Sequence, residues 1–154
     1  MISLLYVDDE PELLDLCKLF LEREGEFSVI TVTSAREGLQ ILAEGMIDAI
    51  VSDYQMPIMD GIEFLKNVRK DFEDIPFILF TGKGREEVVI EAINNGADFY
   101  LQKGGDPRAQ FSELSHKIRQ AFRRKKAEEE LRMMKATVSN AAEGILWINE
   151  TGGI

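Results

Sequence analysis

Five hydrophilic residues follow or end short apolar segments, and together they could carry out phosphoryl chemistry. Asp8 and Asp9 follow the first segment, Asp53 the third, Thr81 ends the fourth, and Lys103 follows the fifth. Clustered carboxylates repel one another and therefore favour a bound cation, and oxygen donors without histidine or cysteine suit Mg²⁺. A carboxylate can also act as a nucleophile, while a metal, a lysine and a hydroxyl group stabilise phosphoryl oxygens. The pattern predicts a Mg²⁺-dependent carboxylate that accepts a phosphoryl group.

Each of these residues also has an ordinary structural explanation when it is considered alone. Asp9 could cap a helix that starts near Pro11, Thr81 could simply end a strand, and Lys103 could be a surface lysine. Only a fold that brings all five residues to one edge favours the chemical interpretation over the structural one.

The elements that would position these residues are short apolar segments alternating with amphipathic helical patterns. Most of the segments lack polar alternation, as expected for strands covered on both faces. The segments are Ile2–Val7, Ser28–Val32, Ile47–Ser52, Phe77–Thr81 and Phe99–Gln102. Five successive βα units predict an α/β fold, a doubly wound five-stranded parallel sheet with helices on both faces. Ligands of such sheets bind beyond the carboxyl ends of the strands.

Helix ends are marked by local sequence signals. Ser34 and Glu37 form a capping box pattern, Asn95-Gly96 indicates the end of a helix, and Asp106-Pro107 indicates the start of another. These signals place the predicted helices between the predicted strands.

Composition excludes several classes of protein. The 154 residues are 45% hydrophobic, carry a formal net charge of −10 and include one cysteine, so a disulfide framework is excluded and nucleic-acid binding is disfavoured. Apolar runs fall short of the roughly 20 residues that span a bilayer, and the N-terminus lacks the basic leader of a signal peptide. We therefore expect a cytoplasmic protein without a membrane span.

Four stretches of the sequence strongly resemble the receiver domain of two-component response regulators. They are Leu5–Glu10, Asp53–Gly61, Phe80–Gly82 and Gly96–Lys103, in the order and spacing of that family over nearly all of residues 1–125. The resemblance implies a flavodoxin-like sheet with strand order 2-1-3-4-5. It also implies a phosphorelay module that accepts a phosphoryl group from the phosphohistidine of a sensor histidine kinase.

The resemblance assigns roles to the acidic residues. Asp53 would be the phosphoacceptor, and Asp8 and Asp9 would hold Mg²⁺, for which Mn²⁺ can substitute, together with Asp53 and the backbone carbonyl of Gln55. Such a module is not an enzyme beyond catalysing its own phosphorylation and dephosphorylation, although a longer parent protein can be a histidine kinase.

The remaining roles fall on the fourth and fifth βα units. Thr81 and Lys103 would contact the phosphoryl group, and Tyr100 would respond to Thr81 as a switch residue. The family usually has a proline directly after the lysine, whereas Gly104 and Gly105 follow it here. Because glycine is conformationally permissive, we expect a less firmly held lysine and an altered rate of phosphorylation or dephosphorylation. Gln55 and Lys83 occupy positions that tune phosphoryl lifetime in this family.

The C-terminal residues indicate a separate segment. We expect a receiver domain over 1–125, a linker helix over 126–139 that continues the last receiver helix, and the truncated start of a PAS domain over 140–154, with a strand around Trp147. The parent would then be a receiver–PAS protein or hybrid histidine kinase. An apolar stripe on the linker helix permits either a homodimeric coiled coil or a monomeric, partly frayed helix. The stripe consists of Ala127, Leu131, Met134 and Val138.

Three other functions compete with a phosphorylated receiver. A haloacid-dehalogenase-like Mg²⁺ phosphatase would need an aspartate where Gln55 stands, and a flavin- or nucleotide-binding domain would need a phosphate loop where Asp8-Asp9-Glu10 would repel phosphate. A docking module without phosphorylation (a pseudo-receiver) is the third. His116 is interpreted as a surface residue and Cys17 as a core residue.

Overall fold

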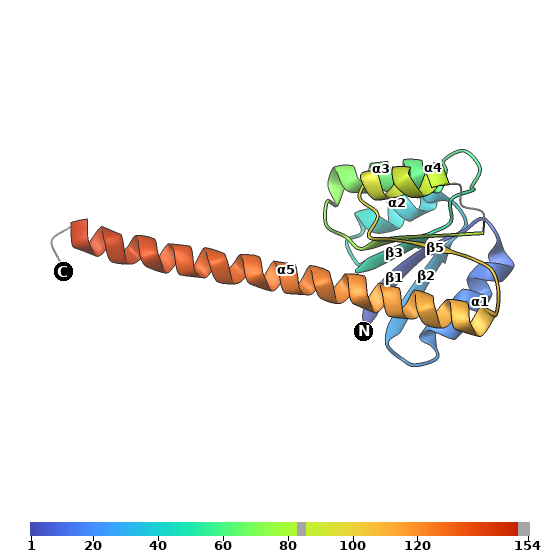
Figure 1. Ribbon diagram of the computed structural model, residues 1–154, viewed down its shortest axis with the longest axis horizontal. Coiled ribbons are helices and arrows are strands. Elements are labelled where there is room, and N and C mark those ends of the chain that lie inside the picture. Colours follow the sequence, from blue (N-terminus) through green and yellow to red (C-terminus); the bar gives the residue numbers. More distant parts are fainter. Residues whose placement is uncertain (83–85, 151–154) are drawn as a thin grey trace. The chain divides into compact units, whose positions relative to one another are not determined.

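The predicted five-stranded sheet is confirmed within the residues that the structure describes. The computed structural model describes the backbone of residues 1–82 and 86–150 and the side chains up to residue 135, apart from 83–85. The strands are β1 (Ile2–Val7), β2 (Phe27–Val32), β3 (Ala49–Ser52), β4 (Phe77–Thr81) and β5 (Phe99–Gln102). They pair in parallel in the order β2-β1-β3-β4-β5 (Figure 1).

Helices alternate with the strands along the chain. They are α1 (Pro11–Glu22), α2 (Ala35–Ala43), α3 (Gly61–Asp71), α4 (Glu86–Asn94) and α5 (Pro107–Glu150). Figure 1 shows α2, α3 and α4 on one side of the sheet and α1 on the other. The predicted doubly wound arrangement is therefore confirmed.

The two faces of the sheet carry separate apolar cores because successive strand residues point to opposite faces. Leu5 and Val7 of β1 pack with α2, α3 and α4. Leu4 and Tyr6 of the same strand pack with α1 and with the early turns of α5. Both faces of the central strands are thus buried, as segments without regular polar alternation predict.

Helix boundaries follow the local signals in the sequence. The amide of Glu37 donates to Ser34 Oγ at 3.2 Å, which confirms the capping box at the start of α2. Helix α4 ends at Asn94, and Gly96 adopts a φ of 98°, a conformation that favours glycine. Helix α5 begins at Pro107, directly after Asp106.

The chain forms two compact units, Met1–Phe122 and Arg123–Ile154. Backbone of the second unit is helical as far as Glu150, so the strand expected around Trp147 is wrong. A helix satisfies its backbone hydrogen bonds locally, whereas a lone strand needs a partner strand. The predicted boundaries after residues 125 and 139 and the PAS assignment stay predictions. Among the described residues, every helix is too short or too polar to cross a bilayer.

Candidate functional site

The carboxyl ends of β1 and β3 bring three aspartates together. These strands are neighbours, and the Asp53 amide donates to the Val7 carbonyl at 2.9 Å directly beyond their paired residues. Carboxylate oxygens of Asp8, Asp9 and Asp53 lie within 4.8 Å of one another. Asp8 is fully buried and Asp53 is 8% exposed, whereas Asp9 is open to solvent. The cluster therefore combines two desolvated carboxylates with one accessible carboxylate.

Lys103 reaches this cluster from the end of β5. Its Nζ lies 2.7 Å from Asp8 Oδ2 and 3.7 Å from Asp53 Oδ1. The Lys103 amide also donates to the Thr81 carbonyl at 2.9 Å, which holds the end of β5 against β4. The lysine therefore offsets part of the negative charge of the two buried aspartates.

The loop after Lys103 has the permissive backbone that its glycines suggest. Gly104 and Gly105 adopt φ values of 143° and 82°, in the region that favours glycine. The Gln110 side-chain amide donates to the Gly104 carbonyl and ties this loop to the first turns of α5. Lys103 thus lies in the site although two glycines directly follow it.

Asp53 is electrostatically unusual because it is buried next to another acid. Burial is the largest cause that raises its pKa above the ordinary value, and the charge of Asp8 raises it further. Lys103, the Thr81 side chain and the Tyr54 amide, which donates to Asp53 Oδ1 at 2.8 Å, counteract only part of this rise. An ionised Asp53 is consequently destabilised until additional positive charge arrives.

Thr81 and Tyr100 lie on adjacent strands and share one face of the sheet. Tyr100 pairs with Leu79 across the two strands, and Thr81 lies two residues after Leu79, so all three side chains point to the same face. Leu79 belongs to the core on the side of α3 and α4. Thr81 is 2% exposed, and burial raises the pKa of the Tyr100 phenol. The Tyr100 hydroxyl is buried and has no hydrogen-bond partner within the described part of the chain. A buried polar group without a partner is costly, so this side chain would gain from an alternative position.

Gln55 lies beside the exposed part of the cluster. A shallow hollow of about 450 Å³ is lined by Asp9, Tyr54, Gln55, Met56, Pro57 and Asp60. The N-cap residue of α1 is Glu10, so Asp9 does not have the capping role that is its structural alternative. The sequence-predicted residue Lys83 falls outside the described residues.

The donor set at this edge fits a hard divalent cation. The carboxylates can supply several oxygen ligands, and one of them is exposed to the solvent from which the remaining water ligands would come. Neither histidine nor cysteine is among the clustered groups. Charge, ligand type and access therefore agree with the predicted preference for Mg²⁺.

Sequence reasoning missed a structural residue behind Asp53. A Cβ atom on Gly61 would lie 2.2 Å from the Asp53 carbonyl oxygen and 3.0 Å from Tyr54 Cα. The Gly61 amide donates to the Tyr54 carbonyl at 2.8 Å, and Asp60 caps α3 by accepting from the Glu63 amide. The pair Asp60-Gly61 before an amphipathic pattern predicts the start of a helix. It does not predict that the Gly61 backbone lies against the backbone of Asp53.

We expect Gly61→Ala to lower the free energy of unfolding by about 1–3 kcal/mol, the range typical of overpacked sites. The added methyl group can be accommodated only if backbone atoms of Asp53 and Tyr54 move. Gly82→Ala is the matched control, because no atom of the described residues lies within 4 Å of its added Cβ. Urea unfolding of both variants measures the difference, and equal stability would contradict the packing argument.

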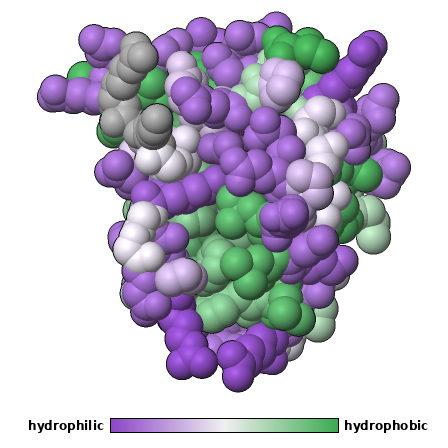
Figure 2. All heavy atoms as spheres, turned by 90° about the vertical axis from the view of Figure 1, so that its right-hand side faces the viewer, coloured by the Kyte–Doolittle hydropathy of each residue, from purple (hydrophilic) through white to green (hydrophobic). Residues whose placement is uncertain are grey.

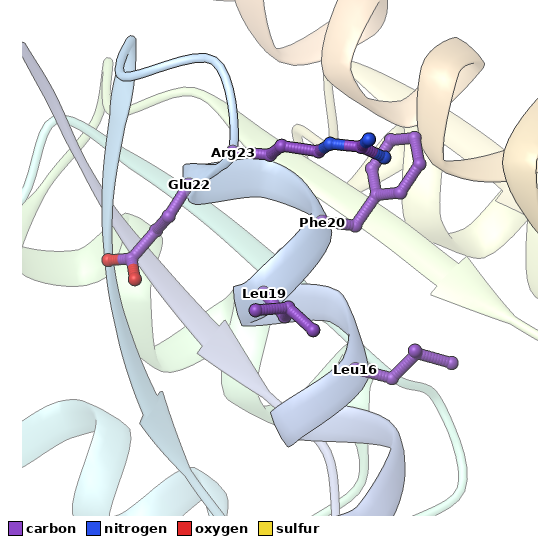
Figure 3. A pocket seen from close by; sticks show the side chains of 5 residues that line it. All are labelled: Leu16, Leu19, Phe20, Glu22 and Arg23. Atoms are coloured by element: carbon purple, nitrogen blue, oxygen red, sulfur yellow. The ribbon is translucent and has the colours of Figure 1, made fainter.

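A second concave surface lies on α1 and is separate from the acidic cluster. Figure 2 shows an apolar area bordered by hydrophilic residues in the lower half of the face on which α1 lies. A hollow of about 440 Å³ there is lined by Leu16, Leu19, Phe20, Glu22 and Arg23 (Figure 3). The Glu22 carboxylate points away from it and accepts from the Val29 amide. This hollow therefore lacks the carboxylate cluster that phosphoryl chemistry requires.

Two other residues lie where the sequence predicts them. Cys17 is fully buried and its thiol donates to the Tyr6 hydroxyl, and burial raises the thiol pKa to about 11. His116 is exposed on α5. A core role for the cysteine and a surface position for the histidine are confirmed.

Comparison with known sequences identifies a single family over most of the chain. Residues 4–119 match the family described as the response regulator receiver domain. The response regulator SaeR of Staphylococcus aureus (strain USA300) is 40% identical over 108 residues, which cover 70% of this chain and 46% of that protein. The chain thus matches about half the length of this relative.

Solved structures give the same result. A response regulator receiver domain protein from Clostridium thermocellum has a TM-score of 0.75 and 32% identity, and covers 82% of this chain and 98% of that chain. A CheY-like receiver domain protein from Methanospirillum hungatei JF-1 has a TM-score of 0.72 and 28% identity, and covers 80% of this chain and 98% of that chain. The similarity therefore extends over nearly the whole of both solved chains.

Proposed function

This chain belongs to the response regulator receiver domain family, and from that premise we propose that Asp53 accepts a phosphoryl group from the phosphohistidine of a sensor histidine kinase. The observation that carries the proposal is the position of the Asp53 carboxylate. It lies against the carboxylates of Asp8 and Asp9 and 3.7 Å from Lys103 Nζ. The carboxylates can thus bind a cation, and the Lys103 ammonium group can bind a phosphoryl oxygen.

Transfer proceeds by attack of an Asp53 carboxylate oxygen on phosphorus. A new O–P bond forms as the N–P bond of the phosphohistidine breaks, and the departing histidine nitrogen keeps the electron pair and takes up a proton. Lys103 lies between Asp8 and Asp53, so its ammonium group can pair with a phosphoryl oxygen when it leaves Asp8. Thr81, whose side chain lowers the pKa of Asp53, can donate from its hydroxyl to a second phosphoryl oxygen.

A divalent cation would be held by Asp8, Asp9, Asp53 and the backbone carbonyl of Gln55. When bound, Mg²⁺ or a substituting Mn²⁺ supplies positive charge against the carboxylates and the incoming phosphoryl oxygens. The three clustered carboxylates support this assignment. Asp9 is exposed, so its carboxylate would be the first ligand that an ion from solvent meets.

Thr81 and Tyr100 form the proposed switch. Phosphorylation would draw the Thr81 hydroxyl toward the phosphoryl group, and the vacated space would admit the Tyr100 ring. The Tyr100 hydroxyl supports this role, because it has no hydrogen-bond partner among the described residues and inward movement would offer it one. A local change of charge would then alter the surface around α4 and β5.

The partners of the module are proposals of the same kind. A sensor histidine kinase or its phosphohistidine domain would be the donor. A PAS or kinase output module in a longer parent chain would receive the signal through the helical second unit. The parent chain could then be a receiver–PAS protein or a hybrid histidine kinase.

Intact mass spectrometry tests the proposed phosphorylation. Incubation with a small phosphodonor and Mg²⁺ is expected to add one phosphoryl group per chain, and a chelator is expected to prevent the addition. Hydroxylamine should remove the group, because it cleaves acyl phosphates and leaves serine and threonine phosphates intact. Absence of an adduct with the small donor and with a panel of phosphohistidine kinases would instead favour the docking-only function.

A further inference from the structure

The apolar stripe on the helix of the second unit continues beyond its first four members, Ala127 to Val138. Its members are separated alternately by four and three residues, the spacing of a coiled-coil seam. They are Ala127, Leu131, Met134, Val138, Ala141, Ile145 and Ile148. Because α5 is helical without interruption to Glu150, all of these positions belong to one helix. The seam therefore covers three full heptads.

This seam is not a continuation of the stripe that packs in the receiver core. Leu114, Ile118 and Ala121 are buried in the first unit and follow the same heptad spacing. The first member of the second stripe, Ala127, comes six residues after Ala121 rather than seven. The change of phase gives the second unit an apolar face of its own. In the described part of that face, Leu131 is 52% exposed and Met134 is 65% exposed.

Charges on the outer face of the second unit pair within the helix. With Leu131 at heptad position a and Met134 at d, the residues Lys125, Lys126 and Glu129 occupy the outer positions b, c and f. Lys125 Nζ and Lys126 Nζ lie 3.8 Å and 4.0 Å from Glu129 carboxylate oxygens. These three residues therefore do not occupy positions e and g, which flank the seam.

The flanking positions e and g carry alternating charges. Arg123 and Glu130 stand at g, Glu128 and Lys135 stand at e, and all four are exposed. In a parallel pair of helices, each g residue faces the e residue five positions later on the other helix. Both such pairings have opposite charges, since Arg123 would face a glutamate and Glu130 would face a lysine.

We propose that this segment pairs with the same segment of a second copy of the chain as a parallel, in-register coiled coil. An antiparallel pair with fully overlapping seams brings g against g and e against e. The charged flanks would then face the positions of Gly144, Ala142 and Asn149, and both ionic pairings would be lost. Charge complementarity therefore selects both the partner and the parallel orientation.

Charge reversal at the flanks tests the proposal in the full chain. Sedimentation equilibrium is expected to show a reversible dimer whose dissociation constant rises roughly five- to tenfold in Glu130→Lys and in Lys135→Glu, since each places two like-charged pairs in the dimer. The double variant, and an equimolar mixture of the two single variants, should recover parental affinity. Glu143→Lys makes the same charge change at an outer f position and should leave the dimer intact.

Cysteine cross-linking tests the orientation. Ala127→Cys should form an intermolecular disulfide on mild oxidation, because equivalent d residues face each other in a parallel pair, whereas an antiparallel pair separates them by about 30 Å. The parent protein is the control, since Cys17 is buried. A chain that stays monomeric, single variants with unchanged affinity, or a dimer without this cross-link would each overturn the proposal.

Discussion

The Asp53→Asn variant is expected to acquire no phosphoryl group under conditions in which the parent chain is fully labelled. A carboxamide oxygen is a far weaker nucleophile than a carboxylate, and the substitution also removes one of the three clustered cation ligands. Intact mass after incubation with phosphodonor and Mg²⁺ measures the loss. Asp15→Asn is the matched control, because Asp15 is exposed on α1 and should be labelled normally. Undiminished labelling of the Asp53 variant would remove Asp53 as the phosphoacceptor.

The same variant is expected to be more stable than the parent when Mg²⁺ is chelated. Burial and the neighbouring Asp8 raise the pKa of Asp53 in the folded state. A raised carboxyl pKa means that ionisation destabilises the fold, so the cost is fully present above the folded-state pKa and fades as the pH falls through it. The gain from Asp53→Asn in urea unfolding should therefore be largest at neutral pH and shrink in acid. A gain independent of pH would contradict this electrostatic explanation.

The Asp8→Asn variant is expected to bind Mg²⁺ at least about tenfold more weakly than the parent, a loss equivalent to about 1.4 kcal/mol. Asp8 supplies a fully buried carboxylate at the centre of the cluster. For the parent, Mg²⁺ at about 100 times its dissociation constant should add about 2.7 kcal/mol to the free energy of unfolding. Melting temperatures measured across a Mg²⁺ titration at constant ionic strength report both effects, with Asp15→Asn again as the control.

The pH dependence of Mg²⁺ binding follows from the Asp53 carboxyl. Protons compete with a cation for the same oxygens, and the raised pKa of Asp53 makes this competition begin at a higher pH than for an ordinary aspartate. Parental affinity should consequently fall on mild acidification. In Asp53→Asn, Mg²⁺ affinity should be lower at neutral pH, and mild acidification should not reduce it further. An identical pH profile in both proteins would exclude Asp53 as a ligand.

The positions of the acidic residues were predictable because they depend on strand order along the chain and on one general property of parallel sheets. Asp8 and Asp53 directly follow mainly apolar segments, and the carboxyl ends of parallel strands lie at the same edge. Strand boundaries were predicted less accurately than strand order. Strand β3 begins at Ala49 rather than Ile47, and the Asp48 side chain just before it accepts from the Ser3 amide.

Other features depend on contacts that no local pattern encodes. The close approach of Gly61 to the Asp53 carbonyl arises where the start of α3 meets the end of β3. Lys103 reaches the cluster although two glycines follow it, because the end of β5 is fixed by its hydrogen bond to β4. The strand expected around Trp147 failed for a related reason, since an apolar segment becomes a strand only when another strand pairs with it.

The acidic site is assembled from strands that are adjacent in the sheet but distant in the chain. Asp8, Asp53 and Lys103 directly follow β1, β3 and β5, and Thr81 ends β4. The chain passes from β1 to β3 through α1, β2 and α2, and it passes from β3 to β4 and from β4 to β5 through one helix each. A chain in which β5 has yet to dock lacks its lysine at the cluster, and one without β3 lacks its acceptor. The candidate site is therefore complete only in molecules whose whole sheet has formed, so cation binding would be lost together with the fold.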